Sequence, residues 1–315
     1  MLTRRTLLGV IGAITLSVTA PAAMAQEEIY IPLISKGFQH QFWQAVKLGA
    51  DQAAAEFDVR VTFEGPDSET MVDRQIDMLA AALANKPSAI GFAALDSQAA
   101  IPLLRKAAEA GISVVAFDSG VESDIPVTTA TTDNVAAAAL AADKMAEFIG
   151  GAGKVAVVAH DQTSRTGIDR RDGFLNRIAE AYPDVEVVSV QYGQGDQLQS
   201  TEVAKAILIA NPGLSGMFGT NEGSAIGIVN AVREMSATDL VIIGYDSGKA
   251  QTNAIREGVM AGAITQNPVG IGYETVKAAL SAYRGEKLPE IIDTGFYYYD
   301  ASNIDEPKIA AVLYD

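Results

Sequence analysis

Five polar side chains each come directly after a short apolar run of the chain. They are Ser35, Asp118, Asn221, Asp246 and Gln266. Carboxylates accept hydrogen bonds from hydroxyl groups, and amides both donate and accept them, so such a set can hold an uncharged, hydroxyl-rich ligand. Each of these residue types is also suited to cap a helix. The recurrence of five polar residues at equivalent places in two halves of the chain favours a ligand site.

Aromatic residues gather just after the first of these positions. Phe38, His40, Phe42 and Trp43 lie between Ser35 and a segment with helical spacing of apolar residues. Phe42 and Trp43, the only tryptophan, can stack on the apolar face of a ring such as a sugar, with polar groups around its rim. Phe38 fits a place in the core equally well.

Motifs of phosphate, metal or hydrolytic chemistry are incomplete in this sequence. The segment 150–154 looks like a phosphate loop, but Phe148 replaces a required glycine and Val155 replaces the Ser or Thr that binds magnesium. A glycine turn that ends a helix explains this segment better. His40 and His160 belong to no close-spaced set of metal ligands, and no Gly-x-Ser-x-Gly pattern occurs. We therefore predict no metal, no cofactor and no catalysis.

The elements that must position these residues alternate between short apolar runs and longer segments with helical spacing. Strands are predicted at Ile29–Ile34, Val59–Phe63, Ala89–Ala93, Ser113–Phe117, Lys154–Ala159, Val185–Gln191, Gly216–Gly219, Leu240–Tyr245 and Gly262–Thr265. This alternation indicates an α/β fold with parallel sheets, whose strands are expected to be buried on both faces. Ligands bind beyond the carboxyl ends of such strands, where the five polar residues lie.

The N-terminal segment is typical of an export signal. Arg4 and Arg5 precede an apolar run, and small residues around Met24 provide a cleavage site, so a signal peptide is predicted over residues 1–25. The paired arginines fit either the general secretory or the twin-arginine route. The mature protein is expected outside the cytoplasm.

Charge and composition narrow the choice of partners. The formal net charge is −16, and no cysteine is present. An acidic surface repels phosphate backbones, so nucleic acid is excluded as a partner. Without disulfides the fold depends on its core, and a hydrophobic content of 49% is enough for two domains.

Several motifs occur together in a recognisable order. Beyond the aromatic segment they are Phe117-Asp118, Asp133-Asn134, the Arg-x-x-Gly-Phe motif from Arg170 to Phe174, Thr220-Asn221, Gly244-Tyr245-Asp246 and Thr265-Gln266. In this order and spacing, over the whole mature length, the chain resembles the ribose-binding type of periplasmic sugar-binding proteins. These are type I periplasmic binding proteins, the solute-binding components of ABC sugar transporters.

The resemblance implies two Rossmann-like lobes joined by a three-crossing hinge near Thr132, Gln266 and Gly295. One lobe would comprise residues 27–132 and 267–295, and the other 133–266 and 296–315. It also implies a monomer that binds a monosaccharide or polyol and presents it to the membrane permease subunits of an ABC importer in the periplasm.

The same resemblance assigns roles to single residues. Asp118 and Asp246 would accept hydrogen bonds from sugar hydroxyls, Arg170 would donate one, and Asn221 and Gln266 would supply amides. Ser35, Phe38, His40, Phe42 and Trp43 would form the first ligand loop. Arg170 has a structural alternative, because it lies next to Arg171 and Asp172 and could pair with a neighbour.

The chain departs from the ribose-binding pattern at several positions. Ala93 stands where that family has asparagine, Ser119 where it has arginine, and His40 near an asparagine position. We expect a pocket that is roomier, or reshaped for a furanose, a hexose, an acyclic polyol or an amino sugar. Two other functions remain open: a glycosidase-like enzyme that uses Asp118 and Asp246, and a sugar-responsive regulatory domain, which would begin with a DNA-binding motif rather than an export signal.

Overall fold

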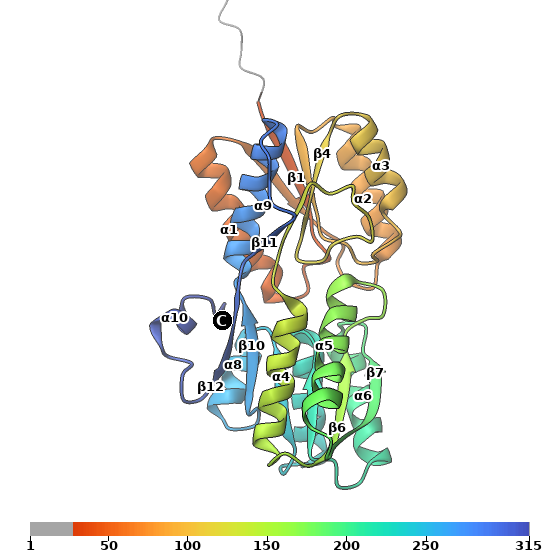
Figure 1. The fold of residues 1–315 in the computed structure, drawn as a ribbon, viewed down its shortest axis with the longest axis vertical. Helices are drawn as coiled ribbons and strands as arrows, with labels where there is room; N and C mark the ends of the chain where they lie inside the picture. The colour runs from red at the N-terminus through yellow and green to blue at the C-terminus, as the bar shows by residue number, and fades with distance from the viewer. Residues whose placement is uncertain (1–27, 315) are drawn as a thin grey trace, which may run out of the picture.

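The computed structural model describes residues 28–314, so the predicted signal peptide lies outside the described residues. The chain forms two α/β lobes, each built on a six-stranded sheet with helices on both faces (Figure 1). The α/β class and the two parallel sheets expected from the sequence are thereby confirmed. Within residues 28–314, no helix combines the length and the apolar character that crossing a membrane requires.

The first lobe contains the sheet with strand order β11-β5-β4-β3-β1-β2. Its strands are β1 (Tyr30–Ile34), β2 (Arg60–Glu64), β3 (Ala89–Phe92), β4 (Ser113–Phe117), β5 (Thr128–Thr131) and β11 (Ile291–Asp293). All neighbours in this sheet are parallel. Its helices are α1 (Gln41–Phe57), α2 (Val72–Ala84), α3 (Ile101–Glu109) and α9 (Pro268–Tyr283).

The second lobe repeats this plan with the strand order β12-β10-β9-β8-β6-β7. Its strands are β6 (Gly153–Ala159), β7 (Val185–Tyr192), β8 (Gly216–Gly219), β9 (Val241–Tyr245), β10 (Gly262–Gln266) and β12 (Phe296–Asp300). Only β12 is antiparallel to its neighbour. The helices are α4 (Asn134–Phe148), α5 (Arg165–Ala181), α6 (Gln197–Ala210), α7 (Glu222–Met235), α8 (Lys249–Arg256) and α10 (Pro307–Ala310).

The chain passes between the two sheets at three places, which lie close together in Figure 1. It leaves the first sheet after β5, returns between β10 and α9, and leaves again between β11 and β12. Thr132 lies at the first passage, where its hydroxyl donates to Gln266 Oε1 (3.0 Å) at the second. The same hydroxyl is 3.4 Å from the carbonyl oxygen of Gly295 at the third.

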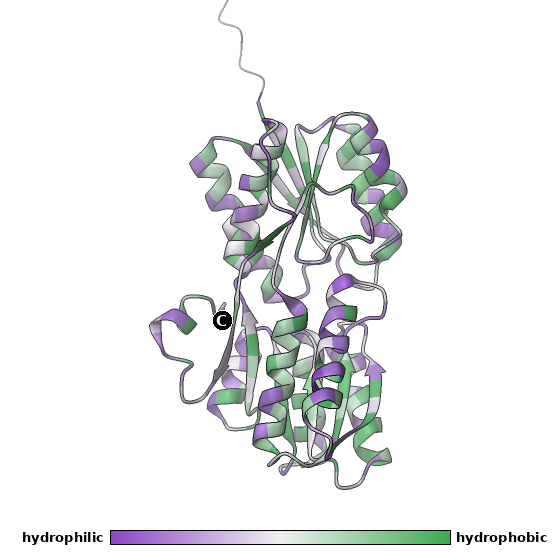
Figure 2. Ribbon diagram, in the orientation of Figure 1, coloured by the Kyte–Doolittle hydropathy of each residue, from purple (hydrophilic) through white to green (hydrophobic). Residues whose placement is uncertain are grey.

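Burial follows the position of each strand in its sheet. The inner strands β1, β3, β8 and β10 are fully buried, as expected from their apolar sequences. The expectation of burial on both faces is wrong for β2 and β7, which are partly exposed because they are the outermost strands of their sheets. In Figure 2 the strands are mostly green, and the purple residues lie largely on the helices and loops.

Three strands were not predicted from the sequence. They are β5, β11 and β12. β5 is rich in threonine, β11 has only three residues with exposed ends, and in β12 only Tyr299 is buried. None of them is an apolar run, so long-range pairing rather than local pattern defines them. The glycine turn before β6 is confirmed, since Gly150 and Gly151 have φ values of 76° and 80° after the end of α4.

Candidate ligand-binding site

A small closed cavity lies between the two lobes, where the carboxyl ends of both sets of strands face each other. Its lining is polar apart from two aromatic rings and comprises Lys36, His40, Phe42, Trp43, Glu69, Asp118, His160, Thr166, Arg170, Asn221, Asp246 and Gln266. The cavity volume is about 20 Å³, which is room for about one water molecule. The lobes are therefore closed on each other, and they must separate to admit a ligand of monosaccharide size and then close less tightly around it.

The two aspartates occupy equivalent positions in the two lobes. Asp118 follows β4 and Asp246 follows β9, and both have left-handed backbones, with φ values of 55° and 80°. Aspartate tolerates this conformation better than most residues, although it still costs free energy. The sharp change of direction places each carboxylate beyond the end of its strand, in the wall of the cavity.

The two carboxylates differ in their partners. Asp246 accepts hydrogen bonds from Gln266 Nε2 (2.8 Å) and from the backbone N–H of Glu222 (3.0 Å). Within residues 28–314, no protein group donates a hydrogen bond to the carboxylate of Asp118, although its side chain is 95% buried. Burial raises the pKa of Asp118 to about 6, against the opposing charges of Lys36 and Arg170. Asp118 is thus an acceptor without a donor.

Arg170 is held rigidly on the opposite side of the cavity by its own lobe. Its Nε donates to Asn134 Oδ1 (2.7 Å), and Nη1 donates to the carbonyl oxygen of Thr220 (3.0 Å). The guanidinium lies 3.8 Å from the centre of the Tyr245 ring. The alternative pairing with a sequence neighbour is wrong, because Asp172 pairs with Arg171 (2.6 Å) and Arg170 points inward.

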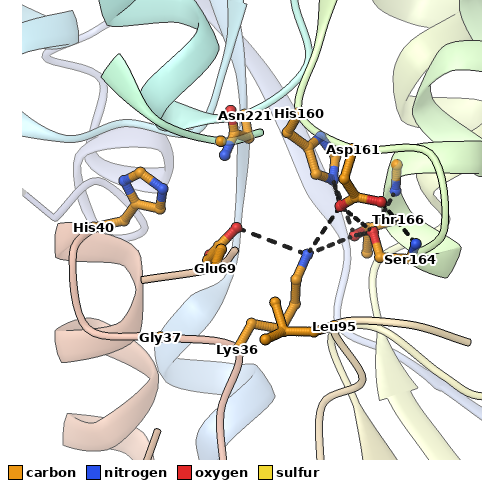
Figure 3. A network of polar contacts seen from close by, with 12 residues as sticks. Lys36, Gly37, His40, Glu69, Leu95, His160, Asp161, Ser164, Thr166 and Asn221 are labelled. Atoms are coloured by element: carbon orange, nitrogen blue, oxygen red, sulfur yellow. Dashed lines mark hydrogen bonds and ion pairs between the residues drawn. The ribbon is translucent and has the colours of Figure 1, made fainter. Parts of the chain in front are cut away.

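A chain of polar contacts connects the tryptophan to the second lobe, and Figure 3 shows its part from Glu69 through Lys36 to Asp161 and Thr166. Trp43 Nε1 donates to Glu69 Oε1 (2.7 Å), and the other oxygen of Glu69 lies 3.9 Å from Lys36 Nζ. Lys36 in turn lies 3.3 Å from Thr166 Oγ1 and 3.9 Å from Asp161 Oδ2, both in the second lobe. Burial alone would raise the pKa of Glu69, but Lys36, His40 and the Trp43 N–H outweigh it and lower that pKa.

The ammonium of Lys36 has more N–H donors than its one hydrogen bond uses. Its ammonium has three N–H donors, is 97% buried, and makes one hydrogen bond of 3.3 Å to Thr166. Both carboxylates are too distant for direct hydrogen bonds of normal length. A hydroxyl group placed between Lys36 and Glu69 could accept from the ammonium and donate to the carboxylate.

His160 belongs to the same polar group. Its two ring nitrogens lie 2.7 Å from Thr220 Oγ1 and 3.3 Å from Thr166 Oγ1. Burial lowers the pKa of His160, so the ring is neutral at physiological pH. It can therefore both donate and accept hydrogen bonds.

The aromatic segment contributes three of its residues to the cavity. Trp43 and Phe42 are fully buried, with ring centres 4.9 Å apart in an edge-to-face arrangement. His40 is 97% buried, and its Nδ1 has no hydrogen-bond partner within residues 28–314. A ligand in the cavity could supply that partner.

Two residues of the predicted first loop do not line the cavity. Ser35 is buried, and its hydroxyl donates to the carbonyl oxygens of Gly37 (3.1 Å) and Glu64 (3.2 Å), which holds the loop in shape. Phe38 is 38% exposed and packs edge-to-face against Phe63. The substituted positions Ala93 and Ser119 also lie outside the lining.

Four lining residues were not predicted as ligand-binding: Lys36, Glu69, His160 and Thr166. His160 directly follows β6, so the rule that found Asp118 and Asp246 would also have found it. Lys36 is one residue beyond Ser35 and so lies close to the same strand end. Glu69 and Thr166 lie beyond their strand ends, in a loop and at a helix start, where nothing local distinguishes them from surface residues.

A larger groove of about 610 Å³ lies beside the hinge crossings and meets the cavity at Asp118. It is bordered by the loop 120–127, by β5, and by residues 288–291. Most of its lining side chains are exposed or half-buried, and its buried polar residues are Asp118, Thr132 and Asn134.

Comparison with known proteins gives a consistent result. The family described as periplasmic binding protein domain matches residues 31–287. A solute-binding protein of Agrobacterium vitis with bound D-fucose is 33% identical, with a TM-score of 0.87 over 90% of this chain and 100% of that one. One from Agrobacterium radiobacter in complex with D-arabinose is 31% identical, with a TM-score of 0.88 over 92% and 100%.

A curated relative agrees with these structures. The D-allose-binding periplasmic protein of Escherichia coli is 25% identical over 265 residues, which cover 81% of this chain and 85% of that protein. The match of the family to most of the described chain, together with the two lobes and the cavity between them, shows that this chain belongs to the periplasmic binding protein domain family.

Proposed function

We propose that this protein is the solute-binding component of an ABC sugar importer and captures a monosaccharide or sugar alcohol in the cavity between its lobes. One observation carries the proposal: polar groups from both lobes converge on a closed cavity with an aromatic wall, and several groups of the first lobe are not fully hydrogen-bonded there. Asp118, Lys36 and His40 all retain bonding capacity there. The proteins with bound D-fucose and D-arabinose support the class of ligand.

The polar residues have different roles in ligand recognition. Asp118 accepts from one or two ligand hydroxyls, and the rigid Arg170 donates to a ligand oxygen. Asn221, Asp246 and Gln266 complete the set from the second lobe. The corner formed by Lys36 and Glu69 suits a hydroxyl and disfavours an unpaired charge, because its two charges already balance. Phe42 and Trp43 cover an apolar face of the ring.

Capture then involves rotation of the lobes about the three crossings near Thr132, Gln266 and Gly295. The moving bodies would be residues 27–132 with 267–295, and residues 133–266 with 296–315. The ligand stabilises the closed form because its contacts to both lobes exist only there. A monomer exported to the periplasm would present this form to the permease subunits and return the ligand chemically unchanged.

Titration of Trp43 fluorescence tests the proposal directly. Because the indole lies in the cavity wall, a bound sugar should change its emission with a single-site binding curve. A panel of pentoses, hexoses, 6-deoxy sugars, polyols and amino sugars, screened first by thermal shift, identifies the ligand. The variant Asp118→Ala should lose the response. A wild-type protein that responds to no member of the panel, or that converts the sugar, contradicts the proposal.

A further inference from the structure

The first turn of α1 lacks a cap from its own lobe. Its N-cap residue, His40, makes no side-chain hydrogen bond to the helix. The free backbone N–H groups of Gln41 and Phe42 instead donate to the two carboxylate oxygens of Glu222, at 3.2 and 3.3 Å. Glu222 is the first residue of α7 in the other lobe. A carboxylate at a helix N-terminus satisfies free donors and opposes the positive end of the helix dipole.

A second helix is capped in the opposite direction. The N-cap of α8 is Gly248, which has no side chain to offer. The backbone N–H of Lys249, the first residue of α8, donates to Gln41 Oε1 (2.8 Å). Gln41 is the first residue of α1, so each lobe supplies the side chain that caps a helix of the other lobe.

The two capping side chains, Glu222 and Gln41, both lie close to Gly248. A side chain on Gly248 would begin 2.9 Å from the carboxylate carbon of Glu222 and 3.2 Å from Gln41 Oε1. The backbone of Gly248 has φ −60°, a conformation open to any residue. Glycine is therefore needed at this position because there is no room for a side chain. Glu222 is also joined to the cavity, since its own N–H donates to Asp246.

We propose that Glu222 and Gln41 are positioning residues for ligand capture, which act as reciprocal helix caps that exist only when the lobes are closed. Opening the lobes leaves both helix ends to water, so the caps add to the stability of the closed form without touching the ligand. They also place the start of α1, which carries His40, Phe42 and Trp43, against the second lobe. The inference rests on the proposed function, because it concerns the closure that accompanies binding.

The test measures closure and binding separately. The chain has no cysteine, so Glu109→Cys in α3 and Glu180→Cys in α5, both exposed, can carry a pair of spin labels or dyes. In this background, Gln41→Ala and Glu222→Ala should shift the interlobe distance distribution toward longer distances. Each should raise the Kd for the sugar found in the panel by about 3- to 30-fold, the range expected for loss of a cap. Gly248→Ala should do the same while both capping side chains remain.

Asp196→Ala is the matched control. Asp196 caps α6 of its own lobe, where Oδ1 accepts from the N–H of Gln199 (2.8 Å). Its loss should lower thermal stability while the distance distribution and Kd stay as in the wild type. The proposal is overturned if the three interlobe variants keep the wild-type distance distribution and Kd. It is also overturned if Asp196→Ala changes the distance distribution and the Kd as much as those variants do. Should wild type bind no sugar, the proposed function fails, while the distances in the ligand-free protein still test the caps.

Discussion

Asp118 shows how a binding residue can oppose stability. Its carboxylate has no hydrogen-bond donor from the described part of the chain, and burial raises its pKa from 3.8 to about 6. Because the pKa is raised in the folded state, the destabilisation is absent below about pH 3.8 and fully present above about pH 6. The shift corresponds to roughly 3 kcal/mol at neutral pH. A bound ligand that donates to this carboxylate offsets the cost.

The variant Asp118→Asn should therefore be more stable than wild type in the absence of ligand, although it binds sugar more weakly. The gain should be at most about 3 kcal/mol near pH 7.5 and should shrink toward about pH 4.5, where the wild-type carboxyl is protonated. Thermal unfolding at several pH values measures it. Asp77→Asn, an exposed position on α2, is the control. Equal stability of Asp118→Asn and wild type at all pH values would contradict the assigned burial cost.

At the scale of elements, the helix that carries the aromatic residues is positioned by close contact with α9. A side chain on Gly49 of α1 would begin 1.9 Å from the carbonyl oxygen of Val269, and one on Gly272 of α9 would begin 1.9 Å from that of Val46. The two backbones thus touch at both glycines. α9 belongs to the first lobe although it follows β10 of the second, so this contact joins distant parts of the sequence.

Replacing Gly272 by alanine should destabilise the protein by about 1–3 kcal/mol, because the added methyl group must push the helices apart. The same exchange in an ordinary helix interior is stabilising, so the sign of the effect is informative. Chemical denaturation measures the loss. Gly120→Ala, where the nearest atom lies 3.9 Å from the added carbon, should stay close to wild type. A stabilised Gly272→Ala variant would show that the helices separate at little cost.

At the scale of the whole molecule, each lobe has its own sheet and its own apolar clusters. One cluster around β1, α1 and α9 belongs to the first lobe, and another around α7, β8 and β9 belongs to the second. The contacts between lobes are mostly polar: the caps of α1 and α8, the contacts of Lys36, and the bond from Ser97 N–H to the carbonyl oxygen of Thr163 (3.0 Å). An apolar contact also crosses the interface, since Tyr314 packs edge-to-face against Phe42 with ring centres 6.1 Å apart.

Ligand binding should consequently change the unfolding of both lobes together. In scanning calorimetry, a sugar at 100 times its Kd should stabilise the folded protein by about 2.7 kcal/mol. Any separate unfolding of the two lobes should merge into one transition, since both contribute to the cavity. A non-binding sugar at the same concentration is the control. A ligand that raised the stability of only one lobe would indicate a site within that lobe.

The class of fold and the places where a ligand could be held were predictable from the amino-acid pattern. Apolar runs such as Ser113–Phe117 and Gly216–Gly219 are buried strands in the structure, because burial on both faces imposes a local apolar pattern. The polar residues that end β4, β9 and β10 line the cavity, since the carboxyl ends of parallel strands share one edge of a sheet. The domain boundaries and the roles of single ligand-binding residues stay predictions.

The other groups that meet in the cavity could not be predicted from the sequence, because three-dimensional folding brings them together. Lys36 and Thr166 are 130 positions apart, and Gln41 and Lys249 are 208 apart. No periodicity relates such residues, because their contact arises from the closure of one lobe on the other rather than from the shape of any single element. The same reason explains β11 and β12: strands of weak local pattern exist because the neighbouring strands β5 and β10 supply their hydrogen-bond partners.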